Sequence, residues 1–173
     1  MLQVSRRLIK GDRRALSEAI SMLERGNPQG TVILRDVFVH TGRSYCIGIT
    51  GPPGAGKSTL TARLTSAFRG AGCSVGVIAV DPTSRHSGGA ILGDRIRMEA
   101  HYLDSEVFIR SMATRGSQGG LPRIINGVVR LLDAGGKDVI LVETVGVGQT
   151  ELDIIGVGDT VIVTLVPEGG DSI

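Results

Sequence analysis

Nine consecutive residues in the first half of the chain have the types and spacing needed to hold a phosphate group. Residues 51–59 read GPPGAGKST, which fits the pattern G-x-x-x-x-G-K-[ST] of loops whose backbone amides cradle nucleotide phosphates. In such a loop Lys57 reaches the β- and γ-phosphates, and the hydroxyl of Ser58 can bind Mg²⁺. An ordinary Gly/Pro-rich turn would not explain the Lys-Ser pair. We expect nucleotide contacts from the whole run: Gly51, Pro52, Pro53, Gly54, Ala55, Gly56, Lys57, Ser58 and Thr59.

The segments on either side of this run predict the elements that must position it. Residues 45–50 form a short apolar run typical of a buried strand. Apolar residues recur at helical spacing over 57–70, and glycines follow as a stop signal. A strand, a Gly-rich loop and a helix in this order direct backbone amides and the positive end of the helix dipole toward one anion.

The rest of the chain predicts alternating strands and helices. Such alternation indicates an α/β fold with a doubly wound, mostly parallel sheet and flanking helices. The near-continuous apolar character of the strands indicates a sheet covered on both faces. An amphipathic helix is expected at 12–25, while 31–40 fits either a helix or a strand. Further strands are expected at 75–80, 106–110, 138–143 and 160–166, with helices at about 92–103 and at 121–134.

Acidic residues stand at the ends of two expected strands. Asp81 follows the strand at 75–80, and Glu143 closes the strand at 138–143. Ligands of open α/β sheets bind at the carboxyl ends of the strands, and Mg²⁺ prefers oxygen ligands. We therefore expect a Mg²⁺ site formed by these acids and Ser58. Acids at strand ends also cap turns, and this alternative is stronger for Asp81 than for Glu143.

Composition excludes several other classes of protein. The chain of 173 residues has 41% hydrophobic and 21% charged residues, as in an ordinary soluble globular domain. A net charge of +2 gives no argument for a nucleic-acid or membrane partner. Residues 1–15 lack the apolar core of a signal peptide. We expect a cytoplasmic protein, or one of the mitochondrial matrix if it is eukaryotic, with Cys46 and Cys73 reduced.

Four segments taken in order carry a family resemblance. The phosphate loop is followed by VDPTS at 80–84, SGGAILGD at 87–94 and VETVGVGQT at 142–150. This set resembles the MeaB/ArgK/MMAA family, the methylmalonyl-CoA mutase-associated chaperones among the SIMIBI-class P-loop GTPases. The resemblance implies an N-terminal helical arm over 1–42 and a P-loop GTPase (G) domain over 43–173.

The same resemblance implies a function. Members bind GTP or GDP with Mg²⁺ and hydrolyse GTP slowly. They act as chaperones that gate cofactor loading and protection of an adenosylcobalamin-dependent acyl-CoA mutase of the methylmalonyl-CoA mutase type. It also implies a homodimer for the full-length form.

Individual positions take roles from the family pattern. Lys57, Glu143 and Gly146 are implied as catalytic residues, with Gly146 close to the γ-phosphate. Asp94 joins the expected metal ligands Ser58, Asp81 and Glu143. The second switch of the family falls at 146–149, and a third would begin at 166–171. Gln149 is a chemically suitable residue for positioning water, although its place in the motif does not establish that role.

The chain also departs from the family pattern. The Asn-Lys-x-Asp motif that reads guanine does not occur in the 173 residues, which stop soon after the last expected strand. We therefore expect a G domain that is incomplete at its C-terminal end, with GTP chosen over ATP by resemblance alone. Two alternatives stay open on the same P-loop fold: a small-molecule kinase, and an ATP-using transport-associated or regulatory ATPase.

Overall fold

The computed structural model describes residues 1–81, 101–113, 124–144, 154 and 156–166. Within these residues, five parallel strands form one sheet in the order β3-β2-β4-β1-β5. The predicted α/β class and parallel sheet are confirmed, and the strand predicted at 45–50 has the predicted bounds. The strands are β1 Tyr45–Thr50, β2 Val75–Asp81, β3 Val107–Ala113, β4 Val139–Glu143 and β5 Thr160–Val163.

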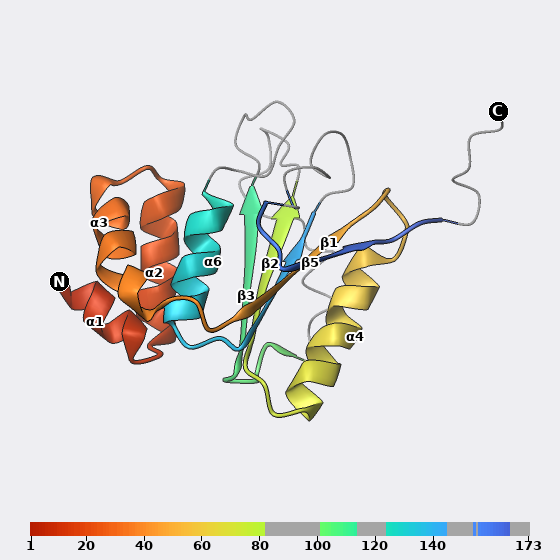
Figure 1. The fold of residues 1–173 in the computed structure, drawn as a ribbon, viewed down its shortest axis with the longest axis horizontal. Helices are drawn as coiled ribbons and strands as arrows, with labels where there is room; N and C mark the ends of the chain where they lie inside the picture. Colours follow the sequence, from red (N-terminus) through yellow and green to blue (C-terminus); the bar gives the residue numbers. More distant parts are fainter. Residues whose placement is uncertain (82–100, 114–123, 145–153, 155, 167–173) are drawn as a thin grey trace.

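Helices cover both faces of this sheet. Figure 1 shows α4 on one face, and α6 with the N-terminal helices α1, α2 and α3 on the other. The prediction at 57–70 is confirmed by α4, and the helix predicted at 121–134 is described from residue 125 onward. The helices are α1 Gln3–Ile9, α2 Arg13–Glu24, α3 Pro28–Val37, α4 Lys57–Gly70 and α6 Ile125–Ala134, with a 3-10 turn η1 at Phe38–His40.

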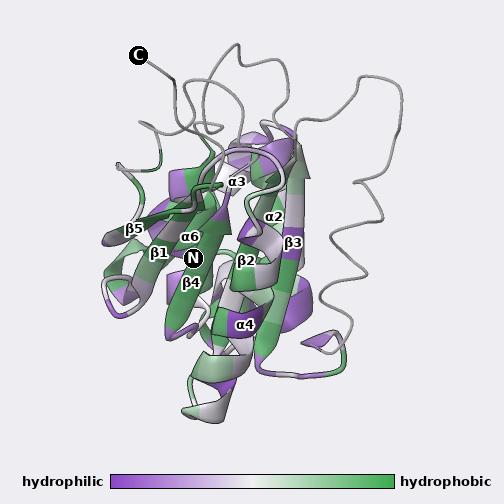
Figure 2. Ribbon diagram, turned by 90° about the vertical axis from the view of Figure 1, so that its right-hand side faces the viewer, coloured by the Kyte–Doolittle hydropathy of each residue, from purple (hydrophilic) through white to green (hydrophobic). Residues whose placement is uncertain are grey.

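Each face of the sheet has its own hydrophobic core. On one face, Ile140 and Val142 of β4 pack with Leu131 of α6. On the other, Leu141 of β4 packs in a cluster that includes Leu60 of α4. Figure 2 shows the hydrophobic colour along β4 and over much of β1 and β2. The expectation of a sheet buried on both faces is therefore confirmed, as parallel sheets require.

Cap residues decide where the N-terminal helices begin. The carboxylate of Asp12 accepts hydrogen bonds from the amides of Arg14 (2.9 Å) and Ala15 (3.1 Å), which starts α2 close to the predicted position. Asn27 caps α3 in the same way, with Pro28 in the first turn. The ambiguous segment 31–40 is therefore helical, as the end of α3 followed by η1. Most of the helix predicted at 92–103 lies outside the described residues.

The N-terminal helices share the core on the α6 face of the sheet. Leu8 of α1, Ile20 of α2 and Ile33 of α3 are fully buried in the same cluster as Ile140 of β4. A Cβ atom on Gly127 of α6 would lie 3.1 Å from Cδ1 of Leu34, so α3 and α6 approach closely. The helices over 3–37 are thus packed onto the sheet layer rather than standing apart from it.

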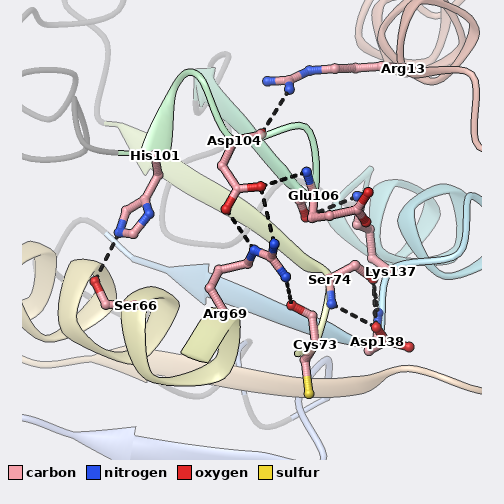
Figure 3. Close-up of polar contacts among 10 residues, drawn as sticks. All are labelled: Arg13, Ser66, Arg69, Cys73, Ser74, His101, Asp104, Glu106, Lys137 and Asp138. Carbon is pink, nitrogen blue, oxygen red and sulfur yellow. Dashed lines mark hydrogen bonds and ion pairs between the residues drawn. The ribbon is translucent and has the colours of Figure 1, made fainter. Parts of the chain in front are cut away.

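Polar contacts fasten the amino edge of the sheet, where the strands begin. Ser74, before β2, donates its amide and its hydroxyl to the carboxylate of Asp138, before β4, each over 2.7 Å. Nearby, the guanidinium of Arg69 at the end of α4 holds the carboxylate of Asp104, with the shorter contact at 2.7 Å. Figure 3 shows both pairs. These bonds hold the starts of neighbouring strands together.

The connection from the N-terminal helices to β1 is fixed at the same edge. Asp133 of α6 accepts hydrogen bonds from three consecutive backbone amides, those of Gly42 (2.5 Å), Arg43 (3.2 Å) and Ser44 (3.1 Å). Gly42 has a φ of 96°, in the region that glycine adopts without strain. One carboxylate therefore sets the path of the chain into β1.

Candidate nucleotide-binding site

The phosphate loop lies between the end of β1 and the start of α4, as the sequence predicts. Gly54 and Gly56 have φ values of 80° and 83°, which suit glycine because a side chain would be strained there. Gly56 is also the N-cap of α4 and has no side chain to cap it. The first-turn amides of a helix have no carbonyl partner within that helix, so this arrangement can present them to an anion.

The side chain of Lys57 folds back over the start of the loop. Its ammonium group donates to the carbonyl oxygens of Gly51 (2.8 Å) and Pro52 (2.9 Å), and the residue is only 7% exposed. These two bonds hold the positive charge beside the start of the loop. Phosphate oxygens compete well for such a donor, because hydrogen bonds between ionised groups are stronger than those to neutral carbonyls.

Ser58 and Glu143 meet although 85 positions separate them in the chain. The Ser58 hydroxyl donates to Oε1 of Glu143 over 2.5 Å. The sheet brings them together because β4 pairs with β1 in a register that sets Glu143 opposite Ile49, just before the loop. Glu143 is 7% exposed, so its carboxylate lies inside the site. The structure thus brings together two of the residues expected to bind Mg²⁺, and their role as ligands stays a prediction.

These two side chains fit the expected Mg²⁺ ion. Both present oxygen atoms, the ligand type that this ion takes. A hydroxyl that donates its proton to a carboxylate keeps lone-pair capacity for a cation. Among the residues that the structure describes, no group of three or more His, Cys, Asp or Glu side chains could hold a metal. Ser58 and Glu143 would thus supply protein oxygens to the ion, and phosphates and water would complete the shell.

The remaining predicted ligands are only partly described. Asp81 is the last residue of β2 and pairs with Ala113 of β3, two positions beyond the residue of β2 that faces Glu143. Its backbone therefore stands at the carboxyl edge beside β4, as predicted. Asp94, Gly146 and Gln149 lie outside the described residues, so their predicted roles stay predictions.

Three threonines beside the loop were not anticipated. They are Thr50, Thr144 and Thr164, at the carboxyl ends of β1, β4 and β5. The Thr144 hydroxyl donates to the hydroxyl of Thr50 over 2.9 Å. The Thr164 amide and hydroxyl both donate to the carbonyl of Thr50, over 2.8 and 3.0 Å. Polar residues at the ends of apolar strands were the available signal, but the sequence assigned a role at this edge to the acids and not to these hydroxyls.

Neither cysteine forms a disulfide in the structure. Burial raises the pKa of the Cys46 thiol to about 12, with the nearby Asp159 charge adding to the effect. A thiol with so high a pKa carries no thiolate at neutral pH and cannot serve as a nucleophile. Among the described residues, the groups placed to act on a phosphate are Lys57, Ser58 and Glu143 together with the loop amides.

A known protein family has the sequence pattern of this chain, including the residues of the site. The model of the family described as methylmalonyl Co-A mutase-associated GTPase MeaB matches residues 16–173, which include the loop, Glu143 and the sheet. The chain belongs to the MeaB family.

Two relatives and one solved structure show how similar this chain is to known proteins and how much of each it covers. A putative GTPase of Pyrococcus horikoshii is 54% identical over 167 residues, covering 96% of this chain and 53% of the relative. The mouse protein named methylmalonic aciduria type A homolog, mitochondrial, is 38% identical over 180 residues, covering 96% and 43%. A crystal structure titled LAO/AO transport system kinase has a TM-score of 0.76 and 30% identity, covering 98% and 51%.

The chain thus spans about half the length of the relatives that it matches. The part that it shares with them contains the phosphate loop and the strand that carries Glu143. No helix within the described residues is long and apolar enough to cross a membrane.

Proposed function

We propose that this chain binds GTP with Mg²⁺ and hydrolyses GTP as a nucleotide switch. The observation that carries the proposal is the contact between Ser58 at the start of α4 and Glu143 at the end of β4. It brings a hydroxyl and a carboxylate together beside a phosphate loop, the arrangement that holds a nucleotide-bound metal in P-loop enzymes. The names of the MeaB family and of its relatives as GTPases support the choice of nucleotide.

Each residue of the site has a separate task in this reaction. Phosphoryl transfer depends on positioning and on charge neutralisation more than on covalent chemistry. The loop amides and Lys57 bind the β- and γ-phosphate oxygens, and Ser58 and Glu143 would hold Mg²⁺, which neutralises charge on those oxygens. Asp81 and Asp94 are proposed as further metal-side residues, and Gly146 as the backbone that approaches the γ-phosphate. Slow hydrolysis, accelerated by a partner, is the expected behaviour.

We further propose that the full-length protein serves an adenosylcobalamin-dependent acyl-CoA mutase. Its role would be that of a chaperone that gates cofactor loading and protection. The family description names methylmalonyl-CoA mutase, and the mouse relative is named for methylmalonic aciduria, which supports this partner class. A homodimer, a cytoplasmic location, a helical arm over 1–42 and a G domain over 43–173 belong to the same proposal.

Two measurements test the proposal in order. The first compares hydrolysis of GTP and ATP by the full-length protein with and without Mg²⁺. We expect Mg²⁺-dependent release of phosphate from GTP, and equal or faster turnover of ATP would contradict the assignment of GTP. The second is a pull-down from its native extract with the GTP-bound and GDP-bound protein as bait. Recovery of no cobalamin-dependent mutase with either form would overturn the partner proposal and leave the GTPase proposal standing.

The solved structure titled as a transport system kinase supports one alternative, an ATP-using kinase or transport-associated ATPase. The two activities differ in where the γ-phosphate goes. A GTPase transfers it to water, whereas a kinase transfers it to an acceptor molecule or protein. Labelled γ-phosphate distinguishes them, because a kinase leaves the label on an acceptor and a GTPase releases it as inorganic phosphate.

A further inference from the structure

Glu143, the last residue of β4, and Thr144, which follows it, contact the two ends of the phosphate loop. Glu143 accepts a hydrogen bond from Ser58, which follows the loop lysine, over 2.5 Å. Thr144 donates to the hydroxyl of Thr50, which precedes the loop, over 2.9 Å. Successive side chains of a strand point to opposite faces of a sheet. The pair Glu143-Thr144 can therefore bind α4 on one face and the end of β1 on the other.

The end of β5 supports the start of the loop from the other side. The Thr164 amide and hydroxyl both donate to the carbonyl of Thr50, over 2.8 and 3.0 Å. A Cβ atom on Gly51 would lie 2.1 Å from the carbonyl oxygen of Thr164, so the first loop residue rests directly on this segment. Only glycine fits there, and its φ of 138° also favours glycine.

Burial makes these hydroxyl contacts sensitive to substitution. Thr50 is 1% exposed and Thr144 is 2% exposed. Removal of one partner would leave the other hydroxyl buried with one hydrogen bond fewer, and such losses weaken the local structure. Thr65 of α4 is fully buried too, but its hydroxyl donates to the carbonyl of Thr61 in the same helix (2.8 Å). The Thr65 bond therefore joins no separate elements.

We propose that Thr144 and Thr164 are positioning residues, which act through Thr50 to fix the start of the phosphate loop relative to its end. The proposal rests on the proposed function, because it assigns these residues to nucleotide binding by the loop. In this proposal both residues act on the loop and not on the nucleotide itself. Their hydroxyls set the spacing between Gly51 and Ser58, over which the loop amides must converge on one phosphate group. When a threonine hydroxyl is lost, the loop stays folded but holds phosphate less well.

The test uses isosteric variants of the full-length protein. Thr144→Val removes the hydroxyl and keeps the side-chain shape, whereas Thr144→Ser keeps the hydroxyl. The affinity and dissociation rate of fluorescent GDP and of a fluorescent non-hydrolysable GTP analogue are measured with Mg²⁺, together with the melting temperature without nucleotide. We expect Thr144→Val to weaken binding by about three- to tenfold, the worth of one net hydrogen bond. Thr144→Ser should restore most of the affinity.

Thr65→Val is the matched control, because it removes an equally buried hydroxyl that makes no contact with Thr50 or the phosphate loop. It should lower the melting temperature by as much as Thr144→Val and leave nucleotide affinity unchanged. If both variants change affinity equally, or neither does, Thr144 has a structural role only and the proposal is wrong.

Thr164→Val provides a second test of the proposal if Thr144→Val does not fold. Its amide bond to Thr50 remains, so the expected loss of affinity is about two- to threefold, below that of a whole hydrogen bond. Wild-type affinity in Thr164→Val would overturn the role of Thr164. If the wild-type protein itself binds no guanine nucleotide, the proposed function fails first, and the variants then show no affinity to lose.

Discussion

The two edges of the sheet bind their polar groups in different ways. At the amino edge, carboxylates are held by amides and a guanidinium, as in the pairs Ser74–Asp138 and Arg69–Asp104. At the carboxyl edge, Lys57 donates to carbonyl oxygens of the phosphate loop, and Glu143 accepts from the hydroxyl of Ser58. The bonds at the amino edge join segments that begin neighbouring strands, whereas those at the carboxyl edge lie beside the phosphate loop, where phosphate and a metal ion would compete for the same groups. The amino edge therefore suits stability, and the carboxyl edge suits exchange with a ligand.

The largest difference is expected from two lysines that both donate to carbonyls. Lys57→Ala should weaken Mg²⁺-nucleotide binding by about a hundredfold or more, because several charge-assisted hydrogen bonds to phosphate are lost. Lys137 at the amino edge donates to the carbonyl of Glu106 over 3.1 Å. Lys137→Ala should leave affinity unchanged. Isothermal titration with GDP measures both, and micromolar affinity retained by Lys57→Ala would remove Lys57 from the phosphate site.

The next largest difference is expected between an acid of each edge, in how much Mg²⁺ nucleotide binding requires. Glu143→Ala should raise the Mg²⁺ concentration needed for half-maximal nucleotide binding by about tenfold, the effect of one lost charge-assisted contact of about 1.4 kcal/mol. Asp138→Asn should leave that concentration unchanged. A Mg²⁺ titration at fixed nucleotide concentration compares them. An unaltered titration for Glu143→Ala would show that this carboxylate does not serve the metal.

A smaller effect, on stability alone, is expected from the ion pair at the amino edge. Arg69→Met should lower the melting temperature by a few degrees, because it removes the partner of Asp104 and the bond from Arg69 to the carbonyl of Cys73 (2.7 Å). Nucleotide affinity should stay at the wild-type value. Loss of affinity in this variant would show that the two edges are coupled and would break the comparison.

Acid provides the mildest test of the same edge. Hydrogen bonds from Ser74 lower the pKa of Asp138 below its usual 3.8, and the bond from Arg69 lowers the pKa of Asp104. A lowered folded-state pKa adds stability above the unfolded value and loses it as the pH falls through the folded value. The melting temperature should therefore drop below about pH 4. Asp138→Asn should have a lower melting temperature at neutral pH and a smaller decrease in acid. A decrease equal to that of the wild type would show that Asp138 does not contribute to the loss of stability in acid.

The sequence predicted the elements that follow strong local rules. The strand at 45–50, the phosphate loop and α4 were predicted because apolar runs, glycines and the Lys-Ser pair agree with one another. The contact of Ser58 with Glu143 was expected from the rule that strand ends meet at one edge. Local signals left 31–40 open between a helix and a strand because of its β-branched residues, although Asn27 and Pro28 mark a helix start.

The contacts that sequence reasoning missed are made between distant segments. Asp133 binds the amides of residues 42–44, and Thr144 binds Thr50, each across about ninety positions of the chain. No periodicity or motif marks such partners, because they depend on the sheet order β3-β2-β4-β1-β5. That order was not predicted, since alternating strands and helices fit several strand orders.

The core shared by the N-terminal helices and the sheet has a consequence for synthesis of the protein. Ile20 and Ile33 leave the ribosome early, but β4 and α6, which bury them, are made only when residues 125–143 have been added. Contacts between segments so far apart in the chain form late. The helices over 3–37 are therefore made before the parts of the sheet and α6 that share their core, and the apolar sides that face this core stay open to chaperones or aggregation until then.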